Sequence, residues 1–99
     1  MDEKLEKALQ ETCPTLAVLY RPGDEDCEAM TPVLEEVRTR LAGKANVVDI
    51  NGTENQDLMR EYKVAAYPAY LLFKDGQLVW HDYGRKSFGE LEHMLREFI

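Results

Sequence analysis

Cysteine is scarce in this sequence of 99 residues, which contains only Cys13 and Cys27. Two cysteines are too few for the disulfide framework that supports many small secreted domains. They also lie on either side of the apolar segment 16–20. A strand of that kind is roughly 17–20 Å long, whereas a disulfide needs Cα atoms within about 7 Å. We therefore expect two free thiols, which fits a reducing compartment.

Long apolar runs and an excess of basic residues are also absent. No segment is apolar for long enough to span a bilayer, and the first ten residues lack the apolar stretch of a signal peptide. These features predict a cytoplasmic protein. The 12 Lys and Arg against 19 Asp and Glu give a net charge of −7, which argues against nucleic acid or membrane as a partner because both favour basic patches.

The residues that could bind a metal are few and poorly spaced. His81 and His93 have no partner at zinc-binding spacing. Residues 24–26 (Asp-Glu-Asp) offer oxygen ligands suited to magnesium or calcium. Consecutive helix residues point in different directions, however, and helix capping accounts for the same side chains. We expect neither a metal site nor a cofactor.

The segment 15–32 organises the rest of the chain. Its apolar run 16–20 predicts a strand that is covered on both faces, as in a central parallel sheet. The Arg-Pro-Gly at 21–23 ends that strand. Asp24 then caps a helix that is predicted over residues 25–42, because its carboxylate can accept the free N–H groups of the first turn.

The other predicted elements give an alternating order of helices and strands. We expect a kink at Pro32 and a C-cap at Gly43 in the long helix. The remaining elements are a helix at 2–11, a strand at 45–50, a helix from a capping box at 53–56 to about 62, a strand at 69–73, a hairpin at 75–76, a strand at 78–83 and a helix that begins at a capping box at 87–90. The order α-βα-βα-ββ-α predicts one α/β domain over residues 1–99.

The strand, turn and helix around Cys27 resemble the active-site segment of the thioredoxin family. That family has an apolar strand, a turn carrying Trp-Cys-Gly-Pro-Cys, and a helix interrupted by a proline. Here Cys27 matches the second cysteine and Pro32 the helix proline. Asp24 stands at the position of the nucleophilic cysteine, Glu25-Asp26 replace Gly-Pro, and Gly23 replaces the tryptophan. The resemblance thus implies the family's scaffold with a degenerate active-site motif.

Three more segments resemble the same family in the same order. They are residues 64–73, with Pro68 before the third strand, the hairpin at 74–79, and Gly84 at the end of the last strand. The likeness covers residues from about 5 to 98. It implies a thioredoxin-like three-layer fold, in which a central mixed sheet of about four strands is flanked by helices.

The resemblance also implies where a partner would bind. It implies that the Tyr67–Pro68 bond is cis and that these two residues flank the turn at Asp24, with Gly84 nearby. In the family, the residue before this proline offers backbone groups to an extended peptide. Gly23, Tyr67, Pro68 and Gly84 are therefore the candidate peptide-binding residues.

Cys27 is the one thiol left at the implied site. A dithiol oxidoreductase needs one thiolate to attack and a second thiol to resolve the mixed disulfide. Val18 also stands where the family has a buried aspartate that aids proton transfer. The helix N-terminus favours a Cys27 thiolate, whereas the acidic residues 24–26 and Glu28 oppose it. We expect a thiol that is not strongly activated, and burial as a small apolar residue is an alternative use.

Two functions remain open. The first is a peptide- or protein-binding module, related to cell redox homeostasis, whose acidic turn prefers a basic or neutral segment. The alternative is a thiol-disulfide oxidoreductase that uses a single cysteine. Cys27 would then form a mixed disulfide with a protein partner or glutathione, and an external thiol would resolve it. The accessibility and acidity of Cys27 distinguish the two.

Overall fold

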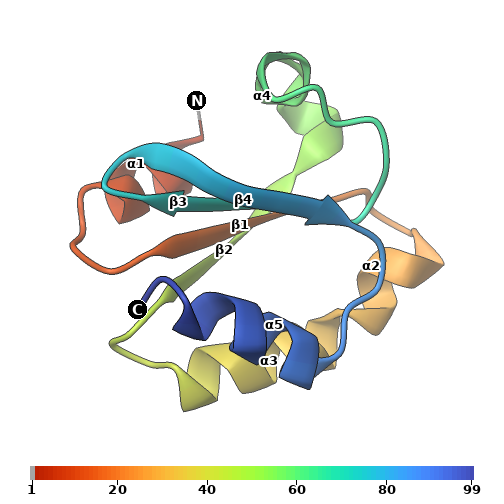
Figure 1. Cartoon of the computed structure of the whole chain (residues 1–99). Coiled ribbons are helices and arrows are strands. Elements are labelled where there is room, and N and C mark those ends of the chain that lie inside the picture. Colours follow the sequence, from red (N-terminus) through yellow and green to blue (C-terminus); the bar gives the residue numbers. More distant parts are fainter. Residues whose placement is uncertain (1) are drawn as a thin grey trace.

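A computed structural model describes residues 2–99 of the chain. Its elements follow the predicted order (Figure 1). They are α1 (Glu3–Leu9), β1 (Thr15–Tyr20), α2 (Glu25–Ala29), α3 (Thr31–Arg40), β2 (Asn46–Asn51), the 3₁₀ helix η1 (Gly52–Glu54), α4 (Gln56–Glu61), β3 (Ala69–Lys74), β4 (Gln77–Tyr83) and α5 (Phe88–Arg96). No helix among the described residues is long and apolar enough to cross a membrane.

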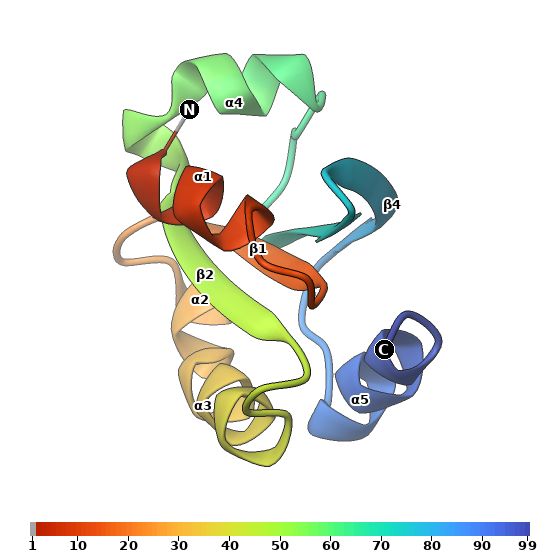
Figure 2. The ribbon, with the colours of Figure 1, turned by 90° about the vertical axis from the view of Figure 1, so that its left-hand side faces the viewer.

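The four strands form one mixed sheet with the order β2-β1-β3-β4. The central strand β1 is parallel to β2 and antiparallel to β3, and β4 pairs antiparallel with β3. Helices α3 and α5 cover one face of the sheet, and α1 and α4 lie on the other (Figures 1 and 2). This arrangement confirms the predicted three-layer α/β fold.

Strand β1 separates two hydrophobic clusters. Leu16 and Val18 belong to the cluster under α3 and α5, whereas Ala17 and Leu19 belong to the cluster under α1 and α4. Side chains alternate between the faces of a strand, so a continuous apolar run supplies both clusters at once. The prediction that residues 16–20 form a strand covered on both faces is confirmed.

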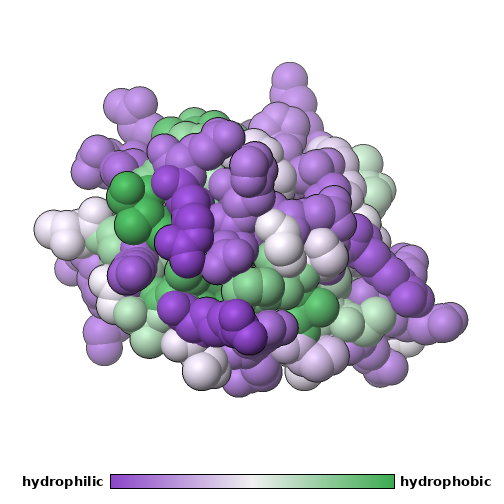
Figure 3. All heavy atoms as spheres, turned by 60° about the horizontal axis from the view of Figure 1, so that its bottom comes forward, coloured by the Kyte–Doolittle hydropathy of each residue, from purple (hydrophilic) through white to green (hydrophobic). Residues whose placement is uncertain are grey.

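The face formed by α3 and α5 is mixed in character. Hydrophobic residues form a band across it between hydrophilic residues (Figure 3). Val33, Phe88 and Phe98 are partly buried and pack against the core cluster on this side of the sheet. The two helices therefore cover the sheet while presenting polar groups to solvent.

The single helix predicted over residues 25–42 is in fact two helices. Helix α2 ends at Ala29, Met30 is buried between the helices, and α3 begins at Thr31 with Pro32 in its first turn. Proline has no backbone N–H to continue the ladder and is well tolerated at the start of a helix. In place of the predicted kink within one helix, the chain therefore has a break between two helices. The C-cap is Leu41, and Gly43 lies beyond it with a φ of +79°.

Of the two predicted capping boxes, only the second is present. Ser87 Oγ accepts a hydrogen bond from the Glu90 N–H at 3.1 Å, and Glu90 Oε1 accepts one from the Ser87 N–H at 3.0 Å. The prediction of a capping box at residues 53–56 is wrong. Instead, Asn51 accepts from the Thr53 N–H and caps η1, and α4 begins without a side-chain cap.

Candidate functional site

Asp24 begins helix α2, as the sequence predicted. Its carboxylate accepts a hydrogen bond from the Cys27 N–H at 3.0 Å and one from the Arg21 guanidinium at 2.5 Å. The two hydrogen bonds hold the pKa of Asp24 below its usual value. Gly23, just before the cap, has a φ of +78°, a conformation that favours glycine. The turn is therefore fixed by an ionised carboxylate at position 24.

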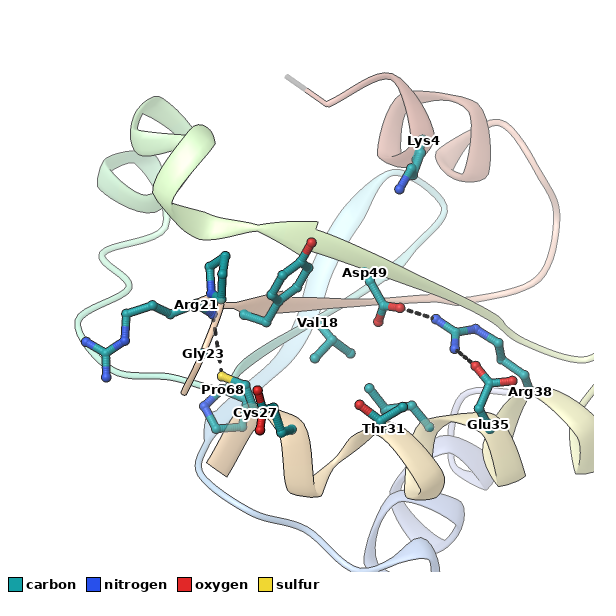
Figure 4. Close-up of a pocket in the computed structure, with 14 residues that line it drawn as sticks. Lys4, Val18, Arg21, Gly23, Cys27, Thr31, Glu35, Arg38, Asp49 and Pro68 are labelled. Carbon is teal, nitrogen blue, oxygen red and sulfur yellow. Dashed lines mark hydrogen bonds and ion pairs between the residues drawn. The ribbon is translucent and has the colours of Figure 1, made fainter. Parts of the chain in front are cut away.

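Cys27 lies in the first turn of α2 and is half-buried. Its Sγ accepts a weak hydrogen bond from the Arg21 N–H at 3.5 Å (Figure 4). Burial is the largest cause that raises the pKa of the Cys27 thiol, and the Asp24 carboxylate raises it further. A thiol that is not strongly activated was expected from the nearby carboxylates, and burial, which was considered only as an alternative use of Cys27, is the larger cause.

Two of the acidic side chains on α2 are paired with a distant residue. Arg85 Nε donates to Asp26 at 2.6 Å, and its Nη2 lies 3.7 Å from Glu25. Arg85 directly follows Gly84, so these ion pairs connect the end of β4 to α2. No local pattern in the sequence indicates this contact, because 59 positions separate Asp26 from Arg85.

The loop before β3 lies beside the turn. The Tyr67–Pro68 peptide bond is cis, and Pro68 is buried. The Gly84 N–H donates to the Pro68 carbonyl at 2.8 Å, and the Tyr70 hydroxyl donates to the Gly84 carbonyl at 2.7 Å. Burial raises the pKa of Tyr70 far above its usual value, which keeps its hydroxyl a donor. The structure thus brings Gly84 and Pro68 together.

Tyr67 joins this loop to the turn through its side chain. The Arg21 guanidinium lies 5.3 Å from the centre of the Tyr67 ring. The ring also packs against Gly52, where an added Cβ would lie 2.6 Å from Tyr67 Cε1. Among the described residues, no hydrogen bond involves the backbone N–H or C=O of Ala66 or Tyr67. The side chain is therefore engaged while the backbone edge is free.

A pocket of about 420 Å³ opens next to Cys27. Gly23, Cys27 and Pro68 lie at one end of it, and Arg38 and Asp49 lie at the other (Figure 4). Two of the four candidate peptide-binding residues, Gly23 and Pro68, thus line the pocket. Tyr67 and Gly84 contact the site from outside the pocket lining.

The charged end of the pocket was not anticipated. Arg38 donates to Glu35 at 2.5 Å and to Asp49 at 2.8 Å. The available signal was a lone aspartate inside the otherwise apolar strand pattern of residues 47–50. Asp49 pairs with Val18 across the β1–β2 ladder. The charged group therefore lies directly beside the apolar floor of the pocket.

The two histidines lie outside the pocket lining. His81 in β4 and His93 in α5 are exposed. Both cysteines are free. In residues 2–99, no group of three or more histidine, cysteine or acidic side chains is arranged to hold a metal ion. The chemistry available at the site is therefore that of one thiol, paired charges and a free backbone edge.

The sequence is similar to a known family model and to several known proteins. Residues 2–97 match the family model described as Thioredoxin. Thioredoxin C-2 of Corynebacterium nephridii is 34% identical over 86 residues, covering 87% of this chain and 80% of that protein. Thioredoxin of Bacillus subtilis is 31% identical over 84 residues, covering 85% and 81% respectively. Thioredoxin of Haemophilus influenzae is 30% identical over 86 residues, covering 87% and 80%. This chain belongs to the thioredoxin family.

Proposed function

We propose that this domain is a non-catalytic member of its family, related to cell redox homeostasis, that binds an extended segment of a partner protein. The observation that carries the proposal is the Asp24 carboxylate three residues before Cys27. That carboxylate caps α2 and is bound by Arg21. It can neither attack a disulfide nor resolve one, since both steps need a thiol.

No second thiol is placed to replace it. Cys13 precedes β1, whereas Cys27 follows the turn at the other end of that strand. Both cysteines are free. The raised pKa of Cys27 leaves little thiolate near neutral pH. These features argue against a complete dithiol cycle within one chain.

The free backbone at residues 66–67 supports the binding role. An extended segment can add its own N–H and C=O groups to such an edge, and side-chain pockets beside the edge then give specificity. A backbone hydrogen bond fixes Pro68 to Gly84, so the loop is held to the end of β4 directly after this edge. Gly23 lies at the same end of the pocket as Pro68 and has no side chain to obstruct a bound segment.

The charge of the turn bears on which segments bind. We expect a basic or neutral segment, because the turn is acidic at residues 24–26. Arg21 and Arg85, however, already compensate Asp24 and Asp26. The turn therefore attracts basic segments less strongly than its sequence suggests, and any strong preference must come from the pocket.

A single-cysteine redox role is the second candidate, because Cys27 lines a pocket that opens to solvent. In that role the Cys27 thiolate attacks a disulfide of a protein or of oxidised glutathione. A mixed disulfide forms and a thiolate leaves. A second, external thiol then releases Cys27 in its reduced form and takes its place in the disulfide.

The alkylation rate of Cys27 separates the two roles. The reduced native chain is treated with iodoacetamide over a range of pH, and each cysteine is quantified by peptide mass spectrometry with Cys13 as the internal reference. We expect slow labelling of Cys27 with a midpoint at or above about 8.5, the value of a free thiol. A midpoint well below that value would overturn the non-catalytic role and support the single-cysteine role.

Binding is tested separately by NMR spectroscopy of the ¹⁵N-labelled chain. The probe is an equimolar mixture of nonapeptides that lack cysteine. We expect saturable shifts at the amides of Ala66, Tyr67 and Gly84, which persist in Cys27→Ser. The absence of shifts at this edge in both proteins would contradict a peptide-binding role.

A further inference from the structure

The pocket next to Cys27 combines an apolar floor with a charged far end. Val18 and Leu34, which line it, are only 2% and 5% exposed, and Pro68 is buried. Asp49 and Glu35 lie at the far end, on either side of Arg38 (Figure 4). A ligand that enters from the Pro68 end therefore meets an apolar surface first and carboxylates second.

Asp49 occupies a position on β2 that packs toward the core. It pairs with Val18 of β1, and cross-strand partners share a face of the sheet. That face also carries Val47 and Leu16, which belong to or pack against the core cluster under α3. A strand position of this kind normally holds an apolar residue. The Asp49 side chain nevertheless stays 44% exposed, because the pocket reaches it.

At the far end of the pocket, two carboxylates share one cation. Arg38 is a single cation between two carboxylates, those of Glu35 and Asp49. Lys4 and Glu28 also line the pocket, and their formal charges cancel. Arg21 lines the pocket as well, so the six charged lining residues balance formally. Arg21 is already paired, however, with Asp24, which is not part of the lining. The far end of the pocket therefore has the capacity to pair with one additional cation.

From these observations we propose that the pocket receives a lysine side chain of the bound segment. Its four-carbon stem lies along Val18, Leu34 and Pro68, and its ammonium group lies between Glu35 and Asp49. Lysine fits better than arginine, because the compact ammonium with three rotatable donors can share two carboxylates with the guanidinium already present. The inference deepens the proposed function and rests on it, since the segment that carries the lysine lies along residues 66–67.

The dimensions of the sheet agree with this placement. Val18 pairs with Asp49 on one side and with Tyr70 on the other. Asp49 is therefore two strand spacings, about 10 Å, across the sheet from β3, and Pro68 lies two residues before Tyr70 along the chain. One pocket is lined by both Pro68 and Asp49, so a continuous cavity joins the two positions.

The test compares two tripeptides in NMR titrations of the ¹⁵N-labelled chain. The probes are acetyl-Ala-Lys-Ala-methylamide and its norleucine counterpart, which has a similar stem without the charge. We expect the lysine probe to shift the amides of Val18, Cys27 and Asp49, and to bind about three- to fivefold more tightly than the norleucine probe. Equal affinities for the two probes, or no shift at these amides, would overturn the inference.

Variants with opposite expected effects sharpen the test. Asp49→Asn should abolish the preference for lysine. Arg38→Met should increase it, because the competing cation is removed. Asp75→Asn, in the hairpin between β3 and β4, makes the same charge change at the other end of the sheet and should leave the preference unchanged. An unchanged preference in Asp49→Asn overturns the inference even if Arg38→Met fails to fold.

The same spectra separate this inference from the proposed function. The amides of Ala66 and Tyr67 report on the backbone edge, whereas those of Val18 and Asp49 report on the pocket. Shifts at the edge without shifts at the pocket would overturn only the lysine assignment. The absence of shifts at both places would contradict the assignment together with the peptide-binding role.

Discussion

The two walls of the site are held in place by different forces. The turn wall, residues 21–27, is fixed by charge, through the contacts of Asp24 with Arg21 and those of Arg85 with α2. The loop wall, residues 64–68, is fixed by packing, since the Tyr67 ring lies against Gly52 and Pro68 is buried. One wall is therefore polar and near the surface, and the other is continuous with the core.

This difference shows which wall can change its chemistry without loss of the fold. Ion pairs between exposed side chains each contribute little to stability. Replacing groups in the turn wall therefore alters its chemistry more than its structure. A change in the loop wall instead disturbs packed side chains and costs more stability. We infer that the turn wall determines the chemistry of the site. The loop wall determines the shape of the binding edge.

The largest expected effect comes from giving the turn wall a second thiol. In Asp24→Cys, two cysteines three residues apart flank the first turn of α2, close enough for a disulfide. A thiol at a helix N-terminus also has a lowered pKa. We expect a reversible disulfide between positions 24 and 27, detectable by mass spectrometry. Reduction of insulin by dithiothreitol should be accelerated about tenfold or more over the wild-type chain.

Asp24→Ser is the matched control, because serine can cap the helix but supplies no thiol. The rate of insulin reduction in the presence of Asp24→Ser should equal the rate with the wild-type chain. If Asp24→Cys forms the disulfide and still matches the control, the loop wall does not accept an extended segment. That outcome would contradict the proposed binding edge.

The second largest expected effect comes from a substitution that disturbs the packing of the loop wall. In Gly52→Ala the new Cβ would lie 2.6 Å from Tyr67 Cε1, so the ring must move. Overpacking of this kind costs about 1–3 kcal/mol. Urea denaturation should therefore show a lower midpoint with an unchanged slope.

Gly89→Ala provides the comparison for this substitution. Gly89 lies in α5, where an added Cβ meets only Ser87 Oγ at 3.9 Å. Alanine should stabilise this position by about 0.4–1 kcal/mol. Equal stabilities for the two variants would show that Tyr67 does not pack tightly on Gly52.

The overall fold could be predicted from local patterns in the sequence. The continuous apolar run at 16–20 identified the central strand, because a strand with two covered faces needs apolar residues at every position. At Pro32 the sequence predicted a kink, and the missing backbone N–H of proline instead produces a complete break at Met30. The cap at Asn51 was not predicted, because several neighbouring polar side chains compete for the same backbone groups and residue types alone do not decide between them.

From the residues alone, the candidate site could be predicted only where its contacts are local, whereas the nearness of Pro68 and Gly84 was implied by the resemblance to a family. Asp24 was assigned correctly as a cap because the group it binds is three residues away. The pairing of Arg85 with α2 and that of Arg38 with Asp49 join distant segments, so no spacing rule indicates them. The burial that raises the pKa of Cys27 likewise exists only in the folded chain.

The smallest expected effect concerns the charge of Asp24 alone. Asparagine caps a helix about as well as aspartate, so Asp24→Asn removes the charge while keeping the cap. The folded-state pKa of Asp24 is lowered, chiefly by the hydrogen bond from Arg21. Its charge therefore stabilises the fold at pH above the unfolded value of about 3.9, and this contribution is lost as the pH falls through the folded-state value.

Thermal unfolding at neutral and at acidic pH measures this contribution. The wild-type chain should melt a few degrees above Asp24→Asn at pH 7, and the gap should close as the pH approaches about 2. Glu25→Gln makes the same change at a side chain that is 95% exposed, and should produce no such gap. A gap that persists at low pH would mean that the Asp24 side chain acts through its shape. The turn wall would then be held by packing, like the loop wall.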